Sequence, residues 1–159
     1  MRPVLRVMLV DDHGFVRSAI RQALTAPDIE IVGEAPSAEE ALRIAPELRP
    51  DVVLIDIDLP GMNGLRLLRE LRPRLPDCKF VMLTVSTSQA DVLEAVRLGA
   101  VGKTLIVDVK PDEGFALSAR NLPRVAVVPS ARITARDVAD TAHVIVTRAA
   151  LETLQDSLS

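Results

Sequence analysis

Aspartates that follow apolar runs carry the clearest chemical signal in this sequence of 159 residues. Asp11 and Asp12 come directly after the first run, Asp56 and Asp58 come at the end of the third, and Thr84 ends the fourth. Carboxylates that gather at one place repel one another, and each raises the proton affinity of the others unless a cation lies between them. Oxygen ligands of this kind suit a hard divalent ion such as Mg²⁺, which takes one or two carboxylates and keeps water.

Each of these residues also has an ordinary structural explanation, because an Asp after a strand is commonly a turn former or a helix cap. The set as a whole nevertheless favours a binding site for a divalent ion. Parallel strands place their carboxyl ends at one edge of a sheet. A sheet with its first and third strands side by side would bring Asp11, Asp12 and Asp56 together, and a hydroxyl at Thr84 would hydrogen-bond an oxyanion held there.

The elements that must position these residues follow a regular alternation. Seven short runs rich in Val, Ile and Leu alternate with longer segments of helical period. Continuous apolar runs are typical of parallel strands buried on both faces, and their alternation with helices predicts an α/β protein. We predict one three-layer, mostly parallel open sheet of about seven strands in a single merged domain. The predicted strands are residues 5–10, 29–32, 52–55, 80–83, 105–109, 125–128 and 144–146, and the predicted helices are residues 15–24, 38–45, 64–71, 88–98, 113–121, 135–140 and 148–158.

Capping signals support several of these helices. Ser37 precedes the second helix and Glu40 follows three residues later, as in a capping box. Asn63 and Gly64 form a turn-rich break before the third helix. Thr147 is placed to cap the last helix.

Composition excludes several classes of protein. Hydrophobic residues make up 48% and charged residues 26%, as in a soluble globular domain. No apolar run approaches the roughly 20 residues that span a bilayer, and the N-terminus lacks the features of a secretory signal. The single cysteine, Cys78, fits a reducing compartment. We expect a cytoplasmic protein. The net charge of −3 argues against strong electrostatic binding to nucleic acid.

Residues 1–102 resemble the receiver domain of bacterial response regulators. The resemblance is carried by the segments VMLVDDHGFVRSAIRQAL, VGEAPSAEEAL, PDVVLIDIDLPGMNGLRLLREL, VMLTVS and DVLEAVRLGAVG. It implies a flavodoxin-like, or more broadly Rossmann-like, fold and a phosphoryl group accepted from a histidine kinase or a small phosphodonor. The roles implied for single residues are Asp56 as phosphoacceptor, Asp11 and Asp12 as the pair that holds Mg²⁺, Asp58 as a metal ligand through its backbone carbonyl, and Thr84 as the hydroxyl that moves toward the phosphoryl group.

The receiver pattern breaks after residue 102. Receivers of this kind continue with an aromatic residue, two apolar residues and a lysine, but here Lys103 stands at the first of these positions and Ile106 at the last. Lys103 would begin the next strand, at the wrong end of the sheet. Lys110 would emerge at the carboxyl end and reach the Asp56 pocket if that strand is four residues longer; the alternative for Lys110 is a solvated loop.

Residues 103–159 resemble the C-terminal half of the fourth large-subunit ribosomal protein of bacteria. The resemblance is carried by ARNLPRVAV, ITARDVADTAHVIVT and RAALETL. The two resemblances together predict a receiver-like segment of four βα units, residues 1–102, completed by a ribosomal-like segment of three, residues 103–159. Such a junction indicates an engineered or recombined chimera.

Three functions compete on this evidence. The first is a chimera without evolved biological function, which keeps a vestigial Asp and Mg²⁺ site. The alternative is a working two-component receiver phosphorylated on Asp56. The third, ribosomal RNA binding, is disfavoured because residues 104–159 hold six Lys or Arg against seven Asp or Glu. We expect no enzymatic activity and no membrane partner, and an exposed sheet edge would allow homodimers.

Overall fold

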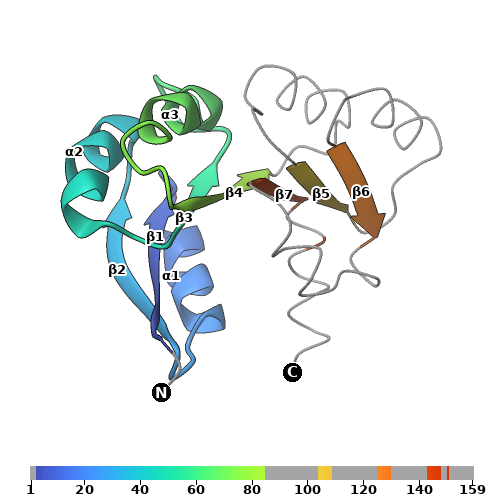
Figure 1. The fold of residues 1–159 in the computed structure, drawn as a ribbon, viewed down its shortest axis with the longest axis horizontal. Helices are drawn as coiled ribbons and strands as arrows, with labels where there is room; N and C mark the ends of the chain where they lie inside the picture. The colour runs from blue at the N-terminus through green and yellow to red at the C-terminus, as the bar shows by residue number, and fades with distance from the viewer. Residues whose placement is uncertain (1–2, 85–103, 109–124, 130–142, 148–149, 151–159) are drawn as a thin grey trace. The chain divides into compact units, whose positions relative to one another are not determined.

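The chain divides into two compact units, Met1–Val81 and Met82–Ser159. The computed structural model describes residues 3–84, 104–108, 125–129, 143–147 and 150 (Figure 1). The first unit is described almost completely and ends within a strand that continues into the second. Its elements are β1 (Leu5–Val10), α1 (Gly14–Ala23), β2 (Ile29–Ala35), α2 (Ala38–Leu48), β3 (Val52–Asp56), α3 (Gly64–Leu71) and β4 (Lys79–Thr84).

Parallel strands form the centre of the first unit. β1 pairs in parallel with β2 on one side and with β3 on the other, and β4 follows next to β3. Helix α1 covers one face of this sheet, and α2 and α3 cover the opposite face (Figure 1). The crossover helices bury both faces, which is why the strands consist of nearly continuous apolar residues. The predicted parallel α/β architecture is therefore confirmed.

A β-bulge interrupts the pairing of β1 with β2. Val7 is opposite Ile31, but the next residue of β1, Met8, is opposite Gly33, so Val32 is an extra residue without a partner in β1. A Cβ atom added at Gly33 would lie 2.4 Å from Cδ1 of Leu48 in α2. The bulge thus places Gly33 directly beneath the Leu48 side chain of α2, which would have to shift to admit a larger residue.

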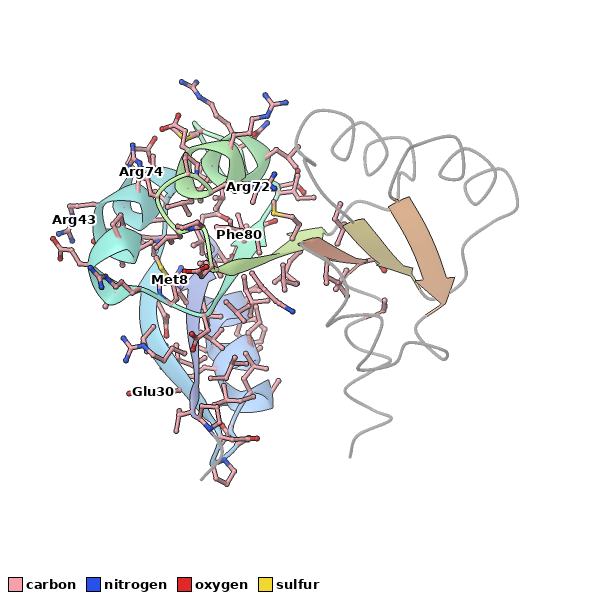
Figure 2. All side chains as sticks on the ribbon, in the orientation of Figure 1. Met8, Glu30, Arg43, Arg72, Arg74 and Phe80 are labelled. Carbon is pink, nitrogen blue, oxygen red and sulfur yellow. The ribbon has the colours of Figure 1, made fainter. Side chains whose placement is uncertain are left out.

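Apolar side chains between the sheet and helices α2 and α3 form the core of the first unit. Met8 and Phe80 are almost completely buried there (Figure 2). The same interior is closed by residues of β3 and α3, including Val53, Ile55, Leu67 and Leu71. Deep burial of the residues just before Asp11 and Asp56 fixes the strands from which these two aspartates project.

The helix caps follow the sequence signals in part. The side chain of Ser37 accepts a hydrogen bond from the backbone N–H of Glu40 at 3.2 Å, which confirms the predicted cap of α2. The Glu40 carboxylate pairs with Arg43, so it does not complete a reciprocal capping box. Helix α2 also runs through Pro46 to Leu48, beyond the predicted end at residue 45. Proline removes one donor, but the helix continues for less than a turn before it ends.

The described strands of the second unit are also parallel. β5 (Thr104–Asp108) pairs with β6 (Val125–Pro129) on one side and with β7 (His143–Thr147) on the other. The hydroxyl of Thr147 accepts a hydrogen bond from the N–H of Ala150 at 3.2 Å, as predicted for a cap of the last helix. A single merged sheet, and a division at residue 102, stay predictions. The helices predicted at 88–98, 113–121 and 135–140 lie outside the described residues, as does nearly all of the one predicted at 148–158. No helix in the described part of the chain is long and apolar enough to cross a membrane.

Cys78 lies just before β4 and is expected to be an unreactive thiol. Burial raises the pKa of this thiol to about 12, and the nearby Asp51 carboxylate adds to the rise. The thiolate is the reactive form, so at pH 8 iodoacetamide should alkylate the folded protein at least about a hundredfold more slowly than the urea-unfolded protein. Mass spectrometry of timed samples measures both rates at this single cysteine. Equal rates in the two states would contradict the prediction.

Candidate functional site

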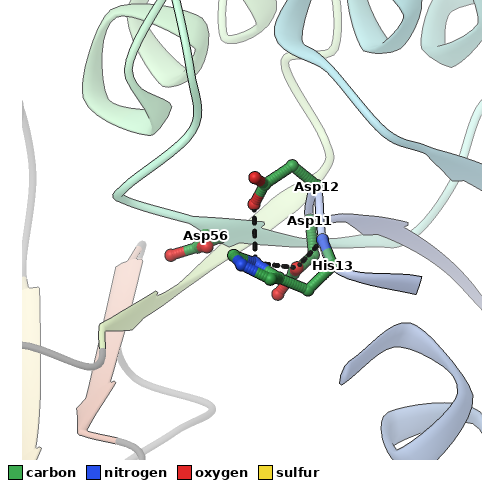
Figure 3. A group of neighbouring side chains, drawn as sticks. All are labelled: Asp11, Asp12, His13 and Asp56. Atoms are coloured by element: carbon green, nitrogen blue, oxygen red, sulfur yellow. Dashed lines mark hydrogen bonds and ion pairs between the residues drawn. The ribbon is translucent and has the colours of Figure 1, made fainter. Parts of the chain in front are cut away.

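The carboxyl ends of β1 and β3 bring three of the predicted aspartates together. Val10 is opposite Ile55 in the parallel pairing of these strands, so the residues that follow, Asp11 and Asp56, lie side by side. Asp12 and His13 come next in the chain after Asp11. One ligand atom from each of these four residues lies within 4.8 Å of the others (Figure 3). We call Asp11, Asp12, His13 and Asp56 the acidic cluster.

Two of the carboxylates are buried. Asp11 is 5% exposed and Asp56 is 6% exposed, and they are the buried charged residues of the described part of the chain. Each accepts a hydrogen bond from a backbone N–H two residues later. The N–H of His13 donates to Oδ1 of Asp11 at 2.7 Å, and the N–H of Asp58 donates to Oδ1 of Asp56 at 3.1 Å. These bonds orient both carboxylates toward the same space.

Burial and neighbouring charge act together on Asp56. Burial raises the pKa of its carboxyl group, and the carboxylates of Asp11, Asp58 and Asp12 raise it further, while the hydrogen bond from the Asp58 N–H lowers it. A buried anion next to other anions is costly, and a cation among them removes most of that cost. Oxygen donors from Asp11, Asp12 and Asp56 are the ligands that Mg²⁺ prefers, so the donor set fits this ion.

The side chain of His13 also belongs to the acidic cluster. Its Nδ1 lies 2.8 Å from Oδ1 of Asp12 and 3.5 Å from Oδ1 of Asp11 (Figure 3). The imidazole is 68% exposed, so it lies at the solvent side of the buried carboxylates. Its position directly after two aspartates was the available signal.

The segment that leaves Asp56 is held closely by the first residue of α3. The N–H of Gly64 donates to the carbonyl of Ile57 at 3.0 Å, and the side chain of Asn63 caps the helix by accepting from the N–H of Arg66. A Cβ atom added at Gly64 would lie 2.1 Å from the carbonyl oxygen of Asp56. Sequence reasoning treated Gly64 as part of a turn and missed this close approach.

The structure describes the other residues of the predicted site only in part. Asp58 is exposed, and its backbone N–H contacts Asp56. Thr84 is the last residue of β4, and Ile106 lies within β5; the side chains of both lie outside the described part of the chain. Lys103 and Lys110 also lie outside it. Their predicted roles are therefore not tested by the structure.

Comparison with known proteins gives a consistent result. The family model described as the response regulator receiver domain matches residues 7–108. The nitrate/nitrite response regulator protein NarL of Escherichia coli K12 is 39% identical over 108 residues, which are 67% of this chain and 50% of that protein. The DNA-binding transcriptional activator DevR/DosR of Mycobacterium tuberculosis is 42% identical over 108 residues, 67% of this chain and 49% of that protein.

The solved structures agree on the fold. The response regulator domain of Thermotoga maritima CheB has a TM-score of 0.56 and 25% identity, and the match covers 96% of this chain and 92% of that one. The chain spans about half the length of the curated relatives it matches.

These matches overturn the prediction of a chimera without evolved function. The family model continues to residue 108, past the predicted junction after residue 102. The prediction was wrong because it took the departures between Lys103 and Ile106 as the end of the family. No comparison supports the ribosomal resemblance of residues 103–159.

Proposed function

The chain belongs to the response regulator receiver family, and from this we propose that it is a working two-component receiver phosphorylated on Asp56. The observation that carries the proposal is the burial of Asp56 beside Asp11 and Asp12 at the carboxyl ends of β1 and β3. Two aspartates that were only structural caps would not be expected to lie buried together, since their mutual repulsion costs stability.

The Asp56 carboxylate is the nucleophile of the proposed reaction. Within the described part of the chain, Oδ1 of Asp56 accepts a hydrogen bond from the Asp58 N–H. The other carboxylate oxygen of Asp56, Oδ2, is left to attack phosphorus. The new O–P bond forms as the bond between phosphorus and the donor's leaving group breaks, and the leaving group departs with the electron pair. A bound Mg²⁺, held by Asp11, Asp12 and Asp56 and by the backbone carbonyl of Asp58, would neutralise charge on the phosphoryl oxygens.

Two further roles are proposed from the family pattern. Thr84 would supply the hydroxyl that hydrogen-bonds the phosphoryl group, and Lys110 would replace the lysine that is missing at Ile106. The phosphoryl group would come from a histidine kinase or a small phosphodonor. The chain acts in this proposal as a phosphoacceptor and not as an enzyme that turns over a separate substrate, and pairing through a sheet edge stays a prediction.

Phosphorylation is tested by incubating the full chain with Mg²⁺ and acetyl phosphate, followed by intact-protein mass spectrometry. We expect a labile added phosphoryl mass in the wild type and none in Asp56→Asn. Asp58→Asn is the matched control, because it removes an exposed neighbouring carboxylate and should still be modified. An unmodified wild type, or an adduct that persists in Asp56→Asn, would rule out the proposal. Loss of the adduct in Lys110→Ala would support the role of that lysine.

A further inference from the structure

We propose that Arg17 is a positioning residue for the acidic cluster: its guanidinium holds the backbone that carries Asp11 and Asp12, and thereby sets the affinity of the site for a divalent cation. The inference rests on the proposed function, since it concerns the same cation. Arg17 lies in the first turns of α1 and does not itself belong to the cluster.

The contacts of Arg17 point in two directions. Its Nη1 donates a hydrogen bond to the backbone carbonyl of Asp11, and its Nε donates to Oε2 of Glu34 at 3.2 Å. The side chain is only 19% exposed, so these bonds form largely out of water. The planar guanidinium has several donors at fixed angles, and a lysine ammonium cannot reproduce this two-sided geometry.

Glu34 supplies the fixed end of this bridge. It lies in β2 opposite Leu9, at the end of β1 where the cluster begins. Its second carboxylate oxygen, Oε1, accepts a hydrogen bond from Arg21. The adjacent residue of β2, Ala35, accepts a hydrogen bond from the N–H of Asp11 at 3.2 Å. Both the N–H and the carbonyl of Asp11 are therefore tied to the β2 region, the carbonyl through Arg17.

The start of helix α1 lacks a side-chain cap. Ile20 is its buried residue, and His13 occupies the N-cap position without a side-chain capping hydrogen bond. A helix that begins without a capping hydrogen bond lacks a common stabilising contact at its first turn. The bridge made by Arg17 therefore adds a side-chain restraint on the segment from Asp11 to Gly14, beside the backbone hydrogen bond from Asp11 to Ala35 and the bond from the N–H of His13 to Asp11.

Restraint of this segment matters for the cation because metal affinity depends on ligands held in place before binding. The carbonyl of Asp11 belongs to the same peptide unit as the N–H of Asp12. If that peptide rotates, the side chains on both sides of it move. Partners that orient ligands typically change metal affinity by about 10–100-fold when they are removed.

The test is Mg²⁺ binding to the full chain by isothermal titration calorimetry, at a temperature well below unfolding. We expect Arg17→Ala to weaken Mg²⁺ affinity about tenfold, and Arg17→Lys to weaken it by about threefold or more. The matched control is Arg21→Ala, which removes the other partner of Glu34 but does not touch Asp11. Arg21 is 53% exposed, and its replacement should leave Mg²⁺ affinity within about twofold of the wild type.

The outcomes separate positioning from simple stabilisation. A merely structural Arg17 would lower the melting temperature of its variants without changing the Mg²⁺ affinity of the folded protein, and that result would overturn the inference. An equal loss of Mg²⁺ affinity in Arg17→Ala and Arg21→Ala would also overturn the inference. If Arg17→Ala does not fold, Arg17→Lys decides by the same criterion. Unchanged affinity together with an Asp56 phosphoryl adduct in the wild type would reject this inference and leave the proposed function standing, whereas a wild type without the adduct would reject the proposed function itself.

Discussion

Gly64→Ala is expected to destabilise the protein by about 1–3 kcal/mol, the usual cost of overpacking a close-packed interior. The added methyl group would lie 2.1 Å from the carbonyl oxygen and 2.9 Å from the carbonyl carbon of Asp56, and 2.9 Å from Cγ2 of Ile55. Backbone atoms cannot rotate away as a flexible side chain can. The strand end that carries Asp56 must therefore shift, and we expect Mg²⁺ affinity and phosphorylation to fall as well.

Urea unfolding followed by circular dichroism measures this loss, because the chain has no Trp or Tyr for intrinsic fluorescence. Gly14→Ala is the matched control. Gly14 is also the first residue of its helix, but its added methyl group would meet only Nη2 of Arg17, at an ordinary 3.7 Å. We expect Gly14→Ala to be neutral or slightly stabilising. If both alanine variants unfold at the same urea concentration, the close approach at Gly64 does not matter.

Asp56→Asn is expected to be more stable than the wild type when divalent cations are absent. The pKa of Asp56 is raised above its ordinary value of 3.8, first by burial and then by the neighbouring carboxylates. Between that value and the raised one, the folded protein binds more protons than the unfolded chain. The free energy of unfolding therefore falls as pH rises through this window. Above the window, the charged Asp56 destabilises the folded state to its full extent. The amide of asparagine removes this cost.

Thermal unfolding with EDTA from pH 4 to pH 7.5 checks this expectation. At pH 7.5 we expect the free energy of unfolding of Asp56→Asn to exceed that of the wild type by on the order of 1 kcal/mol. For a chain of this size, this corresponds to about 2–4 °C in melting temperature. The gain should shrink toward pH 4. Asp58→Asn serves as the comparison, because its exposed side chain avoids most of the desolvation. A wild type whose stability relative to Asp56→Asn did not change with pH would contradict the assignment.

Magnesium should reverse the order of these two proteins. A ligand that binds only the folded state stabilises it in proportion to the logarithm of its concentration. The wild type is therefore expected to gain stability when Mg²⁺ replaces EDTA, and Asp56→Asn, which lacks one of the proposed ligands, should gain less.

Much of the architecture was predictable because it depends on side-chain type alone. Runs of Val, Ile and Leu mark strands buried on both faces, and the parallel direction of β1 and β3 then places Asp11 and Asp56 at one edge. The cap at Ser37 was likewise readable, since it needs only a hydroxyl at the right spacing from Glu40. These features follow from local chemistry and strand order.

The remaining features depend on distances that no local pattern contains. The closeness of Gly64 to the Asp56 carbonyl results from the angle at which α3 meets β3, and the contact of Arg17 with Asp11 results from how α1 lies on the sheet. The place of His13 in the cluster depends on its side-chain rotamer. The predicted end of the receiver family after residue 102 was wrong for another reason. A few unusual side chains at residues 103–106 hid the strand pattern that continues around them.

The bulge at Val32 has a consequence for which insertions and deletions the site tolerates. Successive residues of a strand point to opposite faces, so the register of β2 against β1 decides on which side Glu34 emerges. With Val32 outside the pairing, Glu34 is opposite Leu9 and meets Arg17 on the α1 side. If Val32 instead paired with Met8, Glu34 would be opposite Val10 and point toward the α2 side, and Gly33 would turn away from Leu48. Deletion of Val32 would therefore close the bulge and keep Glu34 opposite Leu9, whereas a one-residue insertion or deletion that the bulge did not absorb would invert the strand end that supports the acidic cluster, without altering any residue of the cluster itself.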